Sequence, residues 1–197
     1  MNSGKVFVIV GAAGSGKTTV AKYLHDRYKM ERIITHTTRA SRPNELDGVD
    51  YHFETPASMN RLHLLESVEY DHHLYGSSLE SLITGWQTGH DDVIVLDTKG
   101  AFTYYQKLGD RAIIIFLTVS HITSLAHRMV KRGDELRAVH SRLKSPEYHR
   151  DLHLPDELKG IANVVVNDSW SQTTTQIDRI VSCLLYTSDA ADDVAGV

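Results

Sequence analysis

The chain has 197 residues, of which 41% are hydrophobic and 23% are charged, and its formal net charge is −4. This length and composition suit one compact unit with insertions and argue against a fibrous or disordered protein. The acidic balance provides no general attraction to nucleic acid or to anionic membranes, so we expect neither as a partner and expect any anion site to be local.

The first predicted element is a strand at Lys5 to Val10, a run rich in β-branched residues and typical of a strand buried on both faces of a parallel sheet. A glycine-rich turn follows, and from Lys17 apolar residues recur at helical spacing. Later stretches repeat both patterns, with strands at 92–97, 111–119 and 163–168 and helices at about 102–108, 122–132 and 174–185. This alternation predicts an α/β fold, with a parallel sheet flanked by helices.

Two stretches break the alternation. Residues 35–83 are rich in His, Tyr, Glu and Ser and predict an inserted subdomain, and residues 132–153 are dense in Arg, Lys and His and predict a mobile cover, or lid. The predicted domain covers residues 1–185, and its core is made of residues 1–34, 84–131 and 154–185. The acidic residues 186–197 lose apolar periodicity, so we expect a disordered tail or sequence foreign to the protein.

Cysteine content and hydropathy indicate the cellular compartment of the protein. Cys183 is the single cysteine, which excludes an internal disulfide. No apolar run approaches the ~20 residues that a membrane span needs. We therefore expect a cytoplasmic protein that does not bind membranes.

The strongest motif is the segment GAAGSGKT, which matches the phosphate-binding loop G-x-x-x-x-G-K-[ST] between a predicted strand and a predicted helix. In such a loop the backbone N–H groups face the phosphates, Lys17 reaches the β and γ phosphates, and Thr18 offers a hydroxyl to Mg²⁺. GTPases, motor ATPases and small-molecule kinases share this loop. The predicted ATP-binding residues here are Gly11, Ala12, Ala13, Gly14, Ser15, Gly16, Lys17, Thr18 and Thr19.

A second anion-binding pattern lies in the segment THTTRASRPNELDGVDYHF. Arg39 and Arg42 are three residues apart, and with the hydroxyls of Tyr51 and Tyr75 they can surround a monoester phosphate with charge-assisted donors. A second phosphate site predicts an acceptor nucleotide.

This segment resembles the guanylate kinase family, in which the phosphate loop is followed by TTR-x-x-R-x-x-E-x-x-G-x-x-Y-x-F. The residues in register are Thr37, Thr38, Arg39, Arg42, Glu45, Gly48, Tyr51 and Phe53. The resemblance continues through LLESVEYDHHLYGSS, VLDTKGA and HRMVKRG and extends to about Leu185. It implies that the γ-phosphoryl group of ATP is transferred to GMP, giving ADP and GDP, by a monomer or homodimer.

The resemblance also implies which residues bind GMP. Guanine presents two adjacent donors, which suit a carboxylate, and the family's base-reading positions carry over to Glu66, Ser77 and Thr35. The predicted GMP-binding residues are Thr35, Arg39, Arg42, Tyr51, Glu66, Tyr75 and Ser77.

For the lid, the resemblance implies a helical segment whose arginines close over the transferring phosphoryl group and neutralise its charge, while lid closure excludes water. These arginines are Arg128, Arg132 and Arg142, and Asn167 matches the position that contacts adenine. Arg128 and Asn167 are accordingly predicted to bind ATP. The predicted catalytic residues are Lys17, Arg39, Arg132 and Arg142.

One feature departs from the family. Asp97 ends a predicted strand and is expected to hold Mg²⁺ together with Thr18. The family usually has L-D-x-D here; aligned on KGA, the chain keeps the second aspartate as Asp97 and has Val95 at the first, whereas a gapped alignment gives Asp97 the first role. One carboxylate is missing either way. Two alternatives therefore stay open: a P-loop kinase for another phosphorylated acceptor, and a catalytically weak guanylate-kinase-like binding module.

Overall fold

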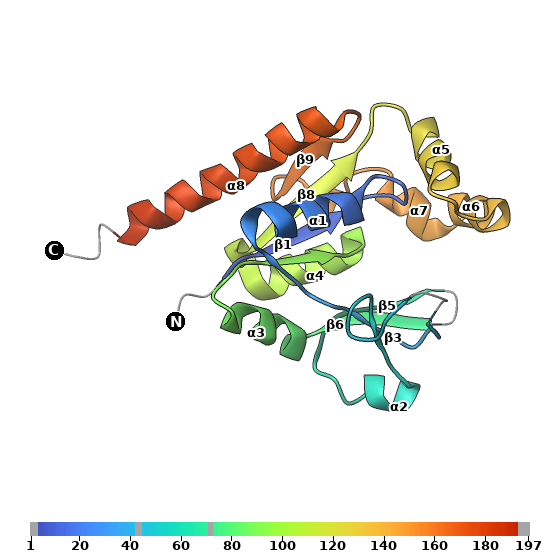
Figure 1. Cartoon of the computed structure of the whole chain (residues 1–197), viewed down its shortest axis with the longest axis horizontal. Coiled ribbons are helices and arrows are strands. Elements are labelled where there is room, and N and C mark those ends of the chain that lie inside the picture. The colour runs from blue at the N-terminus through green and yellow to red at the C-terminus, as the bar shows by residue number, and fades with distance from the viewer. Residues whose placement is uncertain (1–3, 42–44, 71–72, 193–197) are drawn as a thin grey trace.

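The computed structural model describes residues 4–41, 45–70 and 73–192 (Figure 1). Its core is a five-stranded sheet with the strand order β2-β7-β1-β8-β9, in which every pair of neighbours is parallel. The strands are β1 (Val6–Val10), β2 (Glu31–Arg32), β7 (Asp92–Val95), β8 (Ala112–Thr118) and β9 (Ala162–Val166). The predicted α/β fold with a parallel sheet is confirmed.

Helices cover both faces of this sheet. In β1, Phe7 and Ile9 face one side while Val6, Val8 and Val10 face the other, and all five are buried. The side of Phe7 is covered by α1 (Lys17–Tyr28) and α8 (Trp170–Asp192), and the side of Val8 by α3 (Leu79–Gln87) and α4 (Thr98–Leu108). A strand buried on both faces needs a continuous apolar run, which explains the strand pattern in the sequence.

A second sheet follows β2 in the chain and lies below the core in Figure 1. Its strand order is β4-β3-β6-β5, and α2 (Pro56–Met59) lies beside it. The strands are β3 (His36–Thr37), β4 (His52–Phe53), β5 (Leu64–Tyr70) and β6 (His73–Ser78). Strand β6 runs directly into α3, where the Ser78 hydroxyl caps the helix by accepting from Ser81 N at 3.1 Å. The end of the second sheet is thus joined directly to a core helix.

The cover segment is mostly helical. It contains α6 (Leu136–Leu143) and α7 (Pro146–Asp151) and follows α5 (Thr123–Lys131). The break between α6 and α7 occurs where Ser145 caps a helix that begins with proline, a residue suited to the first helical position. The three helices share a small apolar cluster that includes Met129 and Tyr148 and packs against Ala12 of the phosphate loop. The cover is thereby attached to the loop it overlies.

Short 3₁₀ turns, η1 (Gly109–Arg111) and η2 (Asp156–Leu158), complete the described elements. Helix α8 continues to Asp192, past Leu185, where we expected the ordered domain to end. Ala190 and Ala191 are strong helix formers, which favours this continuation. Residues 193–197 of the predicted tail lie outside the described residues. Within residues 4–41, 45–70 and 73–192, no helix combines the length and apolar character that crossing a bilayer requires.

Candidate active site

The phosphate loop joins β1 to α1, and its glycines are required by its geometry. Gly11, Gly14 and Gly16 have φ values of 135°, 83° and 100°, a region that side chains rarely adopt. A Cβ atom at Gly14 would lie 2.7 Å from the carbonyl oxygen of Leu125. The loop borders a cavity of 990 Å³ whose lining includes Ala13, Gly14, Gly16, Lys17, Thr18, Thr19, Arg132 and Arg142.

Lys17 begins α1 and points back over the loop. Its Nζ donates to the carbonyl oxygens of Gly11, at 2.6 Å, and Ala12, at 3.0 Å. Burial lowers the pKa of Lys17 to about 8, with Asp151 acting in the opposite direction and Arg142 and Arg132 lowering it further. Phosphate oxygens are stronger acceptors for an ammonium than carbonyls are, so Lys17 can exchange its two carbonyl acceptors for phosphate oxygens.

Asn167, which follows β9, supports the loop, and Arg128 of α5 holds Asn167. The Asn167 Nδ2 donates to Ser15 O at 2.8 Å, and its Oδ1 accepts from Thr173 Oγ1 at 2.8 Å. Arg128 donates to the Asn167 carbonyl at 2.7 Å. Both polar ends of the Asn167 side chain therefore bond within the protein, and the predicted contacts of Asn167 and Arg128 with ATP stay predictions.

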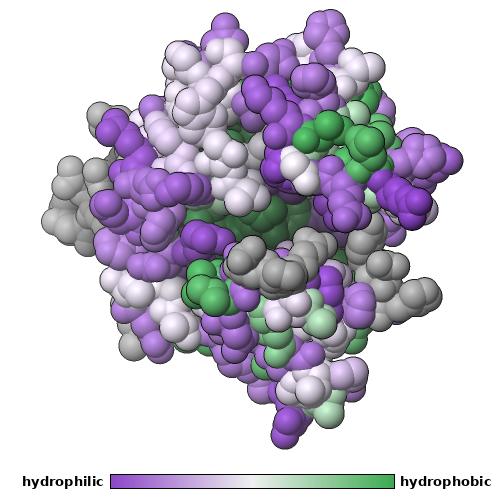
Figure 2. All heavy atoms as spheres, turned by 45° about the vertical axis from the view of Figure 1, so that its right-hand side comes forward, coloured by the Kyte–Doolittle hydropathy of each residue, from purple (hydrophilic) through white to green (hydrophobic). Residues whose placement is uncertain are grey.

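A second cavity, of 590 Å³, lies between the second sheet, the end of β7 and the cover. Figure 2 shows a hollow on this face with hydrophobic side chains at its floor and hydrophilic side chains around it. The predicted residues that line the cavity are Lys17, Thr35, Arg39, Tyr51, Glu66, Tyr75, Asp97 and Arg142. Arg42 lies outside the described residues.

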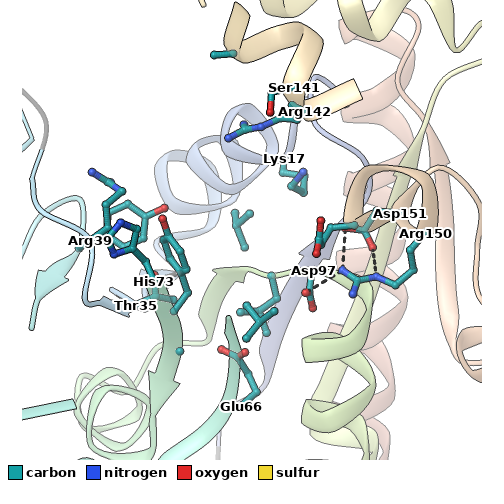
Figure 3. A pocket seen from close by; sticks show the side chains of 18 residues that line it. Lys17, Thr35, Arg39, Glu66, His73, Asp97, Ser141, Arg142, Arg150 and Asp151 are labelled. Atoms are coloured by element: carbon teal, nitrogen blue, oxygen red, sulfur yellow. Dashed lines mark hydrogen bonds and ion pairs between the residues drawn. The ribbon is translucent and has the colours of Figure 1, made fainter. Parts of the chain in front are cut away.

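Arg39 is held in a fixed orientation on one wall of this cavity (Figure 3). Its guanidinium makes two hydrogen bonds to the Glu45 carboxylate, at 2.9 and 3.0 Å. The guanidinium carbon lies 5.5 Å from the centre of the Tyr51 ring and 5.8 Å from that of Phe53. The bonds to Glu45 keep the pKa of Arg39 above its ordinary value. Glu45 thus orients the arginine that faces the cavity.

Glu66 lies on β5 opposite Ser77 of β6, and only 9% of it is exposed. Ser77 Oγ donates to Glu66 Oε1 at 3.0 Å and accepts from the Tyr104 hydroxyl at 2.7 Å. Burial raises the pKa of Glu66 to about 7, although Ser77 acts to lower it and Asp97 raises it further. Ser77 lies behind the carboxylate, and Tyr104 of α4 fixes Ser77. No sequence pattern pointed to Tyr104.

Asp97 follows β7 and caps α4. Its Oδ1 accepts from Gly100 N at 2.6 Å, and its Oδ2 accepts from Arg150 of α7 at 2.9 Å. Asp151 accepts from Thr98 Oγ1 at 2.6 Å and from Arg150 Nε at 2.9 Å. Sequence reasoning missed Arg150 and Asp151, because they belong to no motif and approach Asp97 only through the packing of α7 on α4.

The cover also brings Arg132 and Arg142 to the phosphate loop. Arg132 pairs with Asp134 through two hydrogen bonds. Arg142 lines both cavities, and in the part of the chain that the structure describes its guanidinium has no ion-pair partner. Lys17 and Tyr51 also line both cavities, so the phosphate loop and the second cavity are continuous at these side chains.

Comparisons with known proteins identify relatives of this chain. The family model described as guanylate kinase matches residues 3–183. A guanylate kinase of Thermus thermophilus is 34% identical over 84% of this chain and 74% of its own length. That of Chlorobaculum tepidum is 32% identical over 90% of this chain and 91% of its own. A crystal structure of guanylate kinase from Anaplasma phagocytophilum matches the fold with a TM-score of 0.62, at 23% identity, over 92% of this chain and 86% of that one. The chain belongs to the guanylate kinase family.

Proposed function

We propose that this protein transfers the γ-phosphoryl group of ATP to GMP, producing ADP and GDP. The observation that carries the proposal is the 590 Å³ cavity, which has the buried carboxylate of Glu66, the oriented guanidinium of Arg39 and the phosphate-loop lysine Lys17 in its walls. A monophosphate nucleotide has a base and a phosphate that suit the first two groups. Lys17 lines both cavities and therefore lies between that nucleotide and the loop proposed to hold the donor phosphates.

On the acceptor side, the ionised Glu66 carboxylate would accept hydrogen bonds from N1–H and N2–H₂ of guanine. Adenine presents an acceptor at N1 and has no amino group at C2, so it would leave this carboxylate unpaired, and sites of this kind discriminate strongly. Arg39, with Tyr51 and Tyr75 beside it, would bind the acceptor phosphate. Thr35 lines the same cavity and is proposed as a further contact to the base.

On the donor side, the loop backbone and Lys17 would hold the phosphates of ATP, and Arg132 and Arg142 would approach the group in transfer. Transfer in line needs no covalent enzyme intermediate, because positioning and neutralisation of charge supply most of the catalysis. The helices α5 to α7 would exclude water that otherwise hydrolyses ATP.

Mg²⁺ would neutralise charge on the donor phosphates. Thr18 fits a magnesium site, because its exposed side chain borders the 990 Å³ cavity beside the loop. Asp97 fits as an outer partner, since both its oxygens already accept hydrogen bonds and would retain lone pairs for a metal-bound water. The described residues contain no cluster of three or more His, Cys, Asp or Glu that could hold a metal, which suits an ion held largely by substrate and water.

An assay of ADP release from ATP with GMP, AMP, CMP and UMP tests the proposal. We expect turnover with GMP at least about a hundredfold above AMP in kcat/KM. Preference for a different phosphorylated acceptor would favour the alternative kinase. Binding of GMP without release of ADP would favour the other alternative, a catalytically weak binding module, which the missing carboxylate at Val95 left open.

A further inference from the structure

His73, the first residue of β6, lies in the wall of the acceptor cavity and has no part in the function proposed so far. It is half-buried, and Figure 3 shows it on the side of the cavity that carries Arg39. Within residues 4–41, 45–70 and 73–192, its imidazole makes no hydrogen bond or ion pair. A polar side chain with open donors in the wall of a ligand cavity is suited to contact the ligand.

The pairing of β3 with β6 places His73 opposite Arg39. The two strands are antiparallel, and one residue beyond the paired ladder Thr38 N still donates to the carbonyl of Leu74 at 3.0 Å. The next pair in this register is Arg39 with His73. Residues directly opposite each other in an antiparallel pair share a face of the sheet, with Cβ atoms roughly 4.5 to 5.5 Å apart. Both side chains line the acceptor cavity, as this register requires.

The side chains along β6 follow the order of the groups in a nucleotide. Ser77, Tyr75 and His73 are alternate residues of the strand, so they lie on one face of the sheet. Ser77 supports Glu66, which is proposed to read the base, and Tyr75 is proposed to bind the phosphate. His73 lies two residues further, roughly 7 Å along the strand. Because base and phosphate are opposite ends of a nucleoside monophosphate, His73 lies at the phosphate end.

A phosphate bound beside Arg39 needs further donors. Both terminal nitrogens of Arg39 already donate to Glu45, and this ion pair has no net charge. A phosphate monoester carries roughly −1.5 to −2 charges near pH 7. The hydroxyls of Tyr51 and Tyr75 are neutral donors. An imidazole has at least one N–H donor in either protonation state, so His73 can donate to a phosphate oxygen whether or not it is charged.

We propose that His73 is a further ligand of the acceptor phosphate, with a ring N–H that donates to a phosphate oxygen of the nucleotide held against Arg39. This inference rests on the proposed function, because it takes the acceptor to be GMP with its base at Glu66. It adds to the phosphate site a residue to which neither the arginine motif nor the family resemblance gave a role.

Comparison of GMP with guanosine isolates binding of the phosphate. In NMR titrations of the full chain, the Kd for guanosine divided by the Kd for GMP measures what the phosphate adds. We expect His73→Ala to lower this ratio by about threefold or more, because one charge-assisted donor is lost, while the Kd for guanosine changes by less than about twofold. His73→Gln retains N–H donors and should lower the ratio less.

His90→Ala is the matched control, since His90 is an exposed histidine just before β7 and lines neither cavity. It should leave the ratio at the wild-type value. A smaller decrease in His73→Ala, an equal decrease in His90→Ala, or a loss of guanosine binding as large as that of GMP overturns the proposal. An equal decrease in His73→Ala and His73→Gln contradicts the role as a donor.

The wild-type protein provides a readout that does not depend on the folding of a variant. The ring Cε1–H signal of His73, assigned by its absence from the spectrum of His73→Gln, should shift when GMP is added and shift much less with guanosine. Equal shifts with both ligands would place His73 against the nucleoside and overturn the phosphate contact.

Failure of this inference can be told from failure of the proposed function. If the wild type binds GMP no more tightly than guanosine, it has no acceptor-phosphate site, and both proposals are overturned. If the wild type releases ADP with GMP and His73→Ala keeps the wild-type ratio, only the role of His73 is overturned.

Discussion

The phosphate loop and the acceptor pocket are both proposed to bind phosphorylated nucleotides, but they are built in different ways. The loop motif is eight consecutive residues that follow β1 and whose last two, Lys17 and Thr18, open α1; its expected donors are mostly backbone N–H groups. The pocket collects side chains from the second sheet, from the end of β7 and from the cover. The loop depends on local conformation, whereas the pocket depends on partners such as Glu45, Tyr104 and Arg150 that orient the groups facing the ligand.

The sharpest test of the loop is Lys17→Ala. We expect kcat/KM to fall by at least about a hundredfold, or ~2.7 kcal/mol, because Lys17 is the loop's charged group for the donor phosphates. Lys22→Ala, an exposed lysine on the same helix, serves as the matched control. Retention of more than about a tenth of the activity in Lys17→Ala would contradict the assigned role.

Asp92 is a buried carboxylate far from the pocket. It allows a raised pKa caused mainly by burial to be compared with the raised pKa of Glu66 in the pocket. Asp92, at the opposite end of β7 from Asp97, is fully buried, and among the described residues neither of its oxygens has a hydrogen-bond partner. Burial raises its pKa to about 8 from an ordinary value of 3.8. Between these values the folded state retains a proton that the unfolded chain loses, so stability must fall as pH rises through this window.

Asp92→Asn should remove that dependence. We expect the variant to be more stable than wild type at pH 8.5, by about 2 kcal/mol, and nearly equal at pH 4, as measured by urea unfolding. Activity with GMP should stay unchanged, in contrast to variants of Glu66. Equal stabilities at both pH values would mean that Asp92 does not carry the buried proton.

In the pocket, Glu66→Ala should lower the ratio of kcat/KM for GMP over AMP by about tenfold or more, since guanine loses a bidentate acceptor. In the wild type, GMP affinity should rise as pH increases through about 7, because the ionised form of Glu66 accepts the two donors. Glu69→Gln on the same strand is exposed and provides the control. A ratio within about twofold of wild type, or ~0.4 kcal/mol, would remove Glu66 from base recognition.

The smallest expected effect concerns a supporting residue. Glu45→Gln should raise the Kd for GMP by about fivefold, or ~1 kcal/mol, because Arg39 loses the ion pair that orients it. The Kd for ATP should change by less than about twofold. Glu157→Gln, at an exposed position, controls for the charge. Equal losses for both nucleotides in calorimetry would show that Arg39 does not serve the acceptor alone.

The same contrast explains what could be predicted from sequence. The phosphate loop requires its strand, glycines and lysine in one contiguous segment, so residues 11–18 were sufficient to place it. Strands β1, β7 and β8 were recognisable because burial on both faces requires continuous apolar runs. Strand β9 lies at the sheet edge and has a valine run as well, although Val164 and Val166 are exposed. Strand β2 and the paired strands β3 and β4 have only two residues each, too few for any periodicity to appear.

The acceptor pocket was predictable only in part. Glu66 and Arg39 came from the resemblance to a family, and both line the cavity. Arg150 and Asp151 were missed because their contacts with Asp97 and Thr98 join residues 53 positions apart. A helical lid was expected from the resemblance, but the bounds of α6 and α7 could not be read from the sequence, since only Val139 and Tyr148 are buried apolar positions in them.

The order of strands in the core sheet constrains how the chain folds. The central strand β1 is made first, yet its two neighbours are β7 and β8, and Val6 pairs with Asp92 on one side and Ala112 on the other. Such non-local pairing slows folding, because a long loop must close before the contacts form. During synthesis β1 has no neighbouring core strand until β7 has left the ribosome, and its other edge stays unpaired until β8 follows. The region most exposed to misassembly or chaperone binding is thus the strand that leads into the phosphate loop.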